Sequence, residues 1–131
     1  LADCTPECFE GEPEVPSWST GMAVDADEAV LVTQCWNEVR QLMWNYVGIV
    51  RSDKRLARAR RRLEMVEAEV REDYWSYTLT RDLIELRNIV SVALAIIGCA
   101  SMRRESRGLH YNVDCLNRDD LNWNRHTLLR M

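Results

Sequence analysis

The chain has 131 residues, of which 47% are apolar and 29% are charged, a composition that suits one folded domain and excludes a disordered polymer. The longest nearly apolar run covers residues 89–100 and is broken by Ser91, well short of the roughly 20 residues that span a bilayer, so we expect no transmembrane or signal segment. The net charge of −4 conceals a division, because the first 28 residues carry eight acids and no base while the remainder is basic. The five cysteines are an odd number, which fits a reducing cytoplasm better than secretion.

The first 23 residues are expected to form a linker or arm, because they contain all three prolines and no apolar period. From about residue 25 to residue 50, apolar side chains recur at steps of three and four, which predicts a long amphipathic first helix. Ser52 is the expected N-cap of a second helix that runs to about Tyr74. Its apolar positions follow a heptad-like stripe: Leu56, Ala59, Leu63, Val66 and Val70.

A third helix is predicted from about residue 81 to residue 105, with Thr80 as its cap and Asp82 in its first turn. Its middle is apolar nearly all round, so we expect it to be the most buried of the three. Gly108 is expected to end this helix in a left-handed conformation. Three arginines favour the negative end of its dipole: Arg103, Arg104 and Arg107.

Three helices joined by short connections pack as antiparallel neighbours. The sequence therefore predicts an all-α fold, an up-down-up three-helix bundle over residues 24–107, with an irregular N-terminal arm over residues 1–23. Residues 108–131 show no sustained period and are expected to form an irregular C-terminal tail.

Motifs of catalysis are missing from the sequence: there is no Gly-rich phosphate loop, dinucleotide motif, nucleophile elbow or zinc-binding helix. We therefore expect no catalytic, cofactor-binding or metal-ligating residue in this chain. His110 and His126 are more simply interface residues than an acid–base pair. Cys4 and Cys8 form a CxxxC pair, but no second close pair accompanies it, which disfavours a zinc or cluster site.

A basic stripe opens the second helix, where cations oppose the helix dipole. Its members are Arg51, Lys54, Arg55, Arg58, Arg60, Arg61 and Arg62. The stripe is either a solvated face, aided by pairs such as Arg60 with Glu64, or a surface for an acidic protein partner. No aromatic residues are interleaved and no RNA-binding motif is present, so we expect no nucleic-acid partner.

Two segments resemble a known family. Residues 43–51 read MWNYVGIVR and are followed by DKRL at residues 53–56, while residues 105–114 read ESRGLHYNVD. With Glu85-Leu86-Arg87-Asn88 between them, they resemble the C-terminal helical domain of the L-aspartate oxidase family over about residues 24–114. The succinate dehydrogenase and fumarate reductase flavoproteins of the wider family share a similar second segment, and the first segment favours aspartate oxidase. The family continues with Tyr-Pro after this segment, whereas Cys115-Leu116 follows here.

The resemblance implies an FAD-dependent oxidation of L-aspartate to iminoaspartate in de novo NAD biosynthesis. In that family the flavin and substrate sites belong to preceding domains, so this chain alone is expected to hold no FAD and to be inactive. Its expected role is to dock on and stabilise the flavin-binding and capping portion of the enzyme, with residues 105–111 acting through position. The candidate docking residues are Arg51, Arg55, Arg58, Glu105, Arg107, Gly108, His110 and Tyr111.

Two alternatives remain open at this stage. One is the equivalent domain of a succinate dehydrogenase or fumarate reductase flavoprotein. The other is a free-standing helical binding module that presents the basic stripe to an acidic partner.

Overall fold

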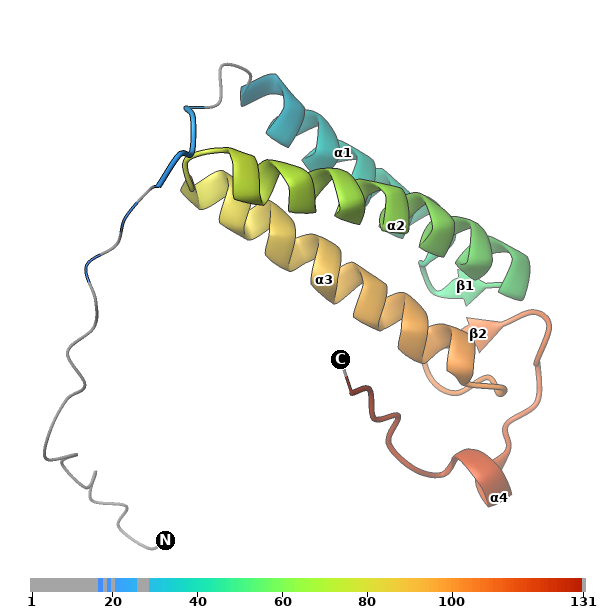
Figure 1. The fold of residues 1–131 in the computed structure, drawn as a ribbon. Helices are drawn as coiled ribbons and strands as arrows, with labels where there is room; N and C mark the ends of the chain where they lie inside the picture. The colour runs from blue at the N-terminus through green and yellow to red at the C-terminus, as the bar shows by residue number, and fades with distance from the viewer. Residues whose placement is uncertain (1–16, 18, 20, 26–28, 131) are drawn as a thin grey trace, which may run out of the picture.

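Three long helices form the bundle in the computed structural model, which describes residues 17, 19, 21–25 and 29–130. They are α1 (Ala29–Tyr46), α2 (Asp53–Ser76) and α3 (Arg81–Met102), and they run up, down and up (Figure 1). The remaining elements are two strands, β1 (Val50–Arg51) and β2 (Tyr111–Asn112), and the short helix α4 (Asp120–Trp123). The prediction of a helical bundle is confirmed.

Side-chain caps fix where α2 and α3 begin, as the sequence predicts. The Ser52 hydroxyl accepts a hydrogen bond from the Arg55 N–H at 3.2 Å. The Thr80 hydroxyl accepts one from the Leu83 N–H at 3.3 Å. Each cap satisfies a backbone donor that the first helical turn leaves without a partner.

The first helix is shorter than predicted, because α1 ends at Tyr46 and the chain then bends through Gly48 into β1. Glycine weakens a helix, and here the Gly48 carbonyl accepts a hydrogen bond from Arg51 Nε at 2.7 Å. This contact turns the chain back on itself directly before α2 begins.

The prediction that Gly108 ends the third helix is wrong. The helix α3 ends at Met102, and Arg103 is its C-cap with extended backbone. Gly108 does have a left-handed φ of 56°, but it lies in a tight turn whose ends, Arg107 and His110, exchange two backbone hydrogen bonds of 2.9 and 3.0 Å. Only the first central residue of this turn has a positive φ, which is the arrangement of a type II′ turn and favours glycine there.

The core lies along the facing stripes of the three helices. All five apolar positions predicted for α2 are buried, and α3 contributes six buried residues, the largest set. Val39 and Leu42 of α1 complete it together with Val47. The outer face of α3 remains open in this chain, however, since Val92 is 57% exposed and Ile96 is 42% exposed.

By length and composition alone, α3 could cross a membrane, contrary to the expectation that no segment could. The core helix of a soluble protein passes the same test, and one such helix is weak evidence. One third of the most apolar window of α3 is buried within this chain, where the stripe packs against α1 and α2.

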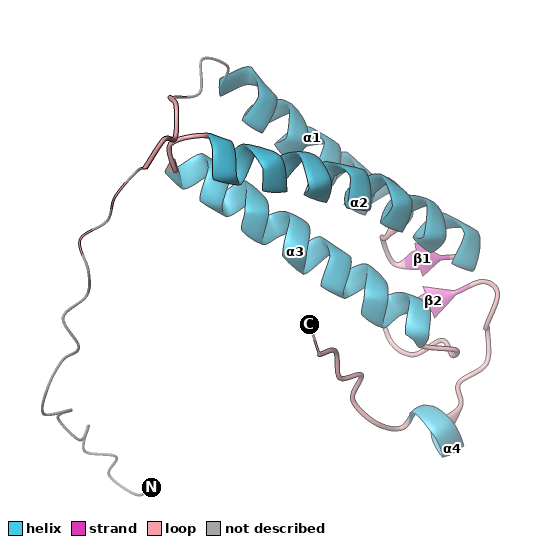
Figure 2. Cartoon of the chain, viewed as in Figure 1, coloured by secondary structure: helices cyan, strands magenta, loops and turns pink. Residues whose placement is uncertain are grey.

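The tail is more ordered than its sequence indicates. Strand β2 pairs in parallel with β1, Val50 opposite Tyr111 and Arg51 opposite Asn112 (Figure 2). After α4 the chain returns along α3, and the Leu129 side chain lies over Gly98. A Cβ atom added at position 98 would lie 3.7 Å from Leu129 Cδ1, which is ordinary van der Waals contact. Segments about 60 residues apart in sequence thus meet at one end of the bundle.

The predicted arm lies mostly outside the described residues. Within residues 21–25, Val24 forms an isolated bridge to Tyr77 at the other end of the bundle. Its N–H donates to the Ser76 carbonyl at 3.2 Å, and its carbonyl accepts from the Thr78 N–H at 2.9 Å.

Leu63→Ala is expected to lower the free energy of unfolding by about 2–5 kcal/mol, because Leu63 is fully buried between the helices and its truncation leaves a cavity. Met65→Ala is the matched control, since Met65 on the same helix is 59% exposed. Urea denaturation measures both. Equal losses for the two variants would contradict this assignment of the core.

Candidate functional site

A fully buried carboxylate, that of Glu105, organises the end of the bundle that carries the tail. Its Oε1 accepts from Arg107 Nε at 2.7 Å and from the Arg103 guanidinium, and its Oε2 accepts from the second Arg107 nitrogen at 2.9 Å. The Asp119 N–H donates to the same Oε2 at 2.9 Å. One side chain therefore connects the end of α3, the turn after it and the start of α4.

The hydrogen bonds from Arg107 lower the pKa of Glu105 to about 2, and the Asp119 N–H and the charge of Arg103 act in the same direction. The pKa of Arg107 is correspondingly raised by its hydrogen bonds to Glu105 and Asp120. Glu105 is therefore ionised at neutral pH and acts as a structural anion, with no proton to exchange.

Arg103 fastens the returning chain to the end of α3. Its guanidinium donates to the backbone carbonyls of Trp123 at 3.1 Å and Arg125 at 2.6 Å. It also reaches the Thr127 hydroxyl at 3.3 Å and lies 5.6 Å from the centre of the Trp123 ring. This one side chain therefore holds residues 123–127 in place.

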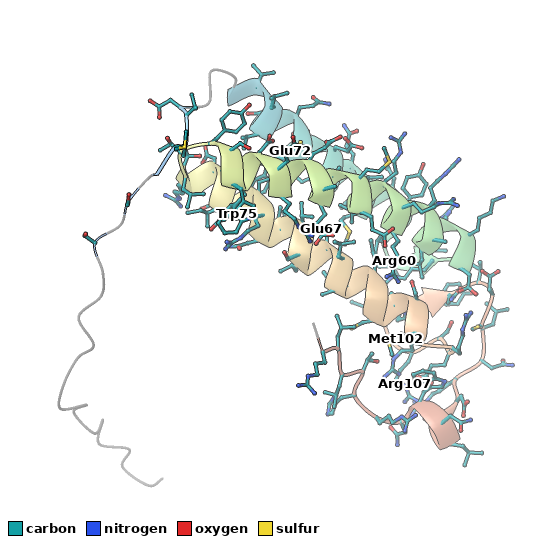
Figure 3. All side chains as sticks on the ribbon, in the orientation of Figure 1. Arg60, Glu67, Glu72, Trp75, Met102 and Arg107 are labelled. Atoms are coloured by element: carbon teal, nitrogen blue, oxygen red, sulfur yellow. The ribbon has the colours of Figure 1, made fainter. Side chains whose placement is uncertain are left out.

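Arg107 fastens α4, and Figure 3 shows it between α4 and the end of α3. Besides Glu105 it binds Asp120 at 2.7 Å, and Asp120 also accepts from Arg118 at 2.7 Å. Asp119 caps α4 by accepting from the Asn122 N–H at 3.1 Å.

A second buried polar junction joins β2 to the start of α2. Asn112, which is 1% exposed, donates from Nδ2 to Asp53 at 3.0 Å, and its N–H donates to Ser106 Oγ at 2.9 Å. Asp53 also pairs with Arg104, and its own N–H donates to Asp114 at 2.7 Å. The hydrogen bond from Asn112, followed by Arg104, lowers the pKa of Asp53.

Arg51 and His110 form a third contact between the two segments. Arg51 Nη1 lies 2.8 Å from His110 Nδ1. Because a guanidinium can only donate, Nδ1 is the acceptor and the ring proton resides on Nε2. Burial, followed by the charge of Arg51, lowers the pKa of His110, so the ring is neutral at pH 7. Nε2 is buried without a hydrogen bond of normal geometry. The Arg103 backbone acts in the opposite direction and raises the pKa of His110, but less than burial and Arg51 lower it.

The candidate docking residues fall into three environments. Glu105 and Arg107 are engaged within the chain, and Glu105 has no exposed surface. Arg51, Gly108, His110 and Tyr111 meet where β1, β2 and the turn come together. The two that remain lie apart from this cluster, exposed on α2: Arg55 and Arg58.

The basic stripe is in part a solvated helix face. Arg60 binds Glu64 one turn later at 2.9 Å, as the pairing of their sequence positions predicts. Arg62 lies 4.0 Å from Glu38 of α1. Exposed pairs of this kind contribute little stability.

Exposed apolar side chains surround the strand pair. This strand patch comprises Ile49, Val50, Leu109, Tyr111 and Val113, each more than 40% exposed. Its two segments are joined by backbone hydrogen bonds, from the Tyr111 N–H to the Ile49 carbonyl at 3.2 Å and from the Val113 N–H to the Arg51 carbonyl at 2.9 Å. Clustered apolar exposure of this kind marks an interaction surface.

Sequence reasoning missed Asp53, Ser106, Asn112 and Asp120, which complete the polar junctions. The first three lie within or beside the two segments that carry the family resemblance. The resemblance was therefore the one signal in the sequence that could have pointed to them. A buried polar contact between distant segments leaves no period in the sequence, so no pattern could assign partners.

No group of three or more His, Cys, Asp or Glu residues is placed to hold a metal ion in the part of the chain that the structure describes. Cys4 and Cys8 lie outside the described residues. Cys35, Cys99 and Cys115 are free and partly buried, and burial raises the pKa of the Cys35 thiol.

Comparison with known proteins identifies relatives. The family model described as "Fumarate reductase flavoprotein C-term" matches residues 36–131, which includes the whole tail. L-aspartate oxidases of Acinetobacter baylyi and Pseudomonas aeruginosa are 52% and 51% identical over 78% and 76% of the chain. The chloroplastic L-aspartate oxidase of Arabidopsis thaliana is 37% identical over 72% of it. The chain covers 19% of the length of each bacterial enzyme and 15% of the plant enzyme.

Glu105→Gln is expected to flatten the acid dependence of stability. The pKa of Glu105 is about 2 in the folded chain, below its ordinary value of 4.5, so the stability that it contributes is fully present above pH 4.5 and is lost as the pH falls toward 2. An amide at this position cannot titrate, so the free energy of unfolding of the variant should change less over that window. Denaturation at a series of pH values measures it. The control is Glu85→Gln, in an exposed pair with Arg81, and identical acid profiles for both variants would contradict the assignment.

Proposed function

Because the chain belongs to the fumarate reductase flavoprotein C-terminal family, we propose that it is the C-terminal helical domain of an FAD-dependent L-aspartate oxidase. The observation that carries the proposal is the identity of about one half to bacterial L-aspartate oxidases over three quarters of the chain. The assembled cytoplasmic enzyme would convert L-aspartate to iminoaspartate for NAD biosynthesis. This chain would supply a docking and stabilising domain.

The residues of this chain do not fit FAD. A dinucleotide places its pyrophosphate at a helix N-terminus that follows a strand, and α2 after β1 is the only long helix in the described residues with that setting. Two carboxylates, those of Asp53 and Asp114, already stand there, and Asp114 takes the first N–H of α2. Negative charge at this position repels phosphate, so the flavin and every redox step belong to the other portion of the enzyme.

The strand patch is the surface that we assign to docking on the flavin-binding and capping portion. It offers exposed apolar area on a backbone held rigidly by three polar junctions. A rigid apolar surface loses little conformational freedom when it binds, which favours affinity. Gly108 and Tyr111 shape this surface, while the contact between Arg51 and His110 joins its two segments.

The basic stripe is a second candidate contact with the flavin-binding portion, supported by fewer observations than the strand patch. Arg55 and Arg58 are exposed and remain available to solvent or to an acidic surface of the same enzyme. The equivalent domain of a succinate or fumarate flavoprotein is the alternative, since the family description names fumarate reductase. The similarity to enzymes named L-aspartate oxidase favours the first assignment.

Reconstitution in trans tests the docking role. The flavin-binding portion of the Acinetobacter baylyi enzyme, truncated before the region that matches this chain, is mixed with the chain, and retention of FAD and oxidation of L-aspartate are followed. Both are expected to rise on mixing, and neither is expected from the chain alone. Leu109→Ser should weaken the association by about tenfold, because Leu109 is 74% exposed in the strand patch and apolar anchors dominate interfaces.

The matched control is Met65→Ser, which also replaces an exposed apolar side chain by serine but lies on α2, outside the strand patch. It should associate as the unmodified chain does. Equal rescue by Leu109→Ser and Met65→Ser would overturn the strand patch as the docking surface, and no rescue by the unmodified chain would overturn the proposed function.

A further inference from the structure

A basic cavity lies between the end of α3, the Arg107–His110 turn and the returning chain. Its volume is about 430 Å³. Three guanidinium groups, two imidazole rings and one indole form most of its walls: Arg103, Arg107, Arg125, His110, His126 and Trp123. None of the residues that line it in the described chain is acidic.

The positive charge of this cavity is only partly compensated within the chain. Arg103 and Arg107 are paired with Glu105 and Asp120, neither of which lines the cavity. The Arg125 guanidinium lies 5.9 Å from the centre of the Trp123 ring, and no carboxylate of the described residues lies within 4 Å of it. Arg125 therefore remains available for an anion that enters.

The Arg51–His110 contact adds a further cation close to the same wall, without a carboxylate partner among the described residues. Arg51 is partly buried, yet its hydrogen bonds go to two neutral acceptors, the Gly48 carbonyl and His110 Nδ1. His110 in turn carries its proton on Nε2, which is buried and makes no hydrogen bond of normal geometry within the described chain. An anion in the cavity would therefore meet the neutral His110 ring together with the surrounding cations.

We propose that this cavity binds a small carboxylate group. Guanidinium forks match the geometry of a carboxylate, and the Trp123 ring offers an apolar wall for the carbon chain that carries it. Two sources share this chemistry: a free small carboxylic acid, and an Asp or Glu side chain of the flavin-binding portion. The second source rests on the proposed function, whereas the first does not.

Calorimetric titration of the 131-residue chain with succinate, at low and at physiological salt, tests the proposal. Succinate is expected to bind saturably and to change the fluorescence of Trp123, with Trp123→Phe identifying the contribution of that ring. Arg125→Gln should weaken binding by about tenfold, the effect of one charge-assisted hydrogen bond. No hydrogen bond of its side chain holds the described fold, and circular dichroism verifies that the variant is folded.

The matched control is Arg130→Gln, which removes an exposed arginine of the same tail that does not line the cavity. It should bind succinate as the unmodified chain does. Inorganic phosphate is titrated in parallel, and equal affinity for phosphate and succinate would overturn the assignment to carboxylates.

The second arm repeats the titration after the flavin-binding portion has been added. If the complex no longer binds succinate, and Arg125→Gln also weakens the complex, the natural occupant is a side-chain carboxylate of that portion. If the complex still binds succinate, the occupant is a free acid. Absence of saturable binding to the chain together with unchanged assembly by Arg125→Gln would overturn the cavity proposal. Reconstitution by the unmodified chain would leave the proposed function standing.

Discussion

One buried carboxylate, that of Glu105, connects the end of α3, the turn after it and the start of α4. Removing an ionised carboxylate from water is costly unless charged partners and hydrogen-bond donors surround it. Glu105 meets this condition with two arginines and one backbone N–H, which come from residues 103, 107 and 119. Since the strands are two residues long and α4 has four, little regular structure could hold this segment otherwise. Its path is therefore set by ionic and polar contacts, whereas the helices are set by the apolar core.

Because the apolar core fixes the helices and polar contacts fix the tail, the chain can present an exposed apolar surface on the tail. The core fixes three helices, and their shared end offers a platform on which the tail is pinned at Glu105, Asn112 and His110. The strand pair then exposes apolar side chains from two segments distant in sequence. The same tail lines the basic cavity, and the arginines that bind Glu105 form part of its wall. Variation in the tail would alter docking without disturbing the bundle.

The helices were predictable from sequence because their signals are local. The stripe of Leu56, Leu63 and Val70 and the caps Ser52 and Thr80 each depend on neighbours within a few residues. The prediction that Gly108 ends the third helix is wrong because a left-handed glycine serves a helix end and a tight turn equally well. The contacts of Arg103 and Arg107 with residues 120–125, which no local pattern shows, hold the segment after Met102 in its non-helical path. Asn112 shows the same limit, since its partner Asp53 lies 59 residues away. The resemblance marked the right segments but not their contacts.

Amide hydrogen exchange in the Glu105→Gln variant tests the central claim most directly. If Glu105 fixes the tail on a bundle that folds independently, residues 106–123 should lose protection while the cores of α1, α2 and α3 keep theirs. The Asp119 N–H, which donates to Glu105 in the unmodified chain, should be among the amides that exchange faster. Unchanged protection of the tail, or an equal loss of protection throughout the three helices, would contradict the account.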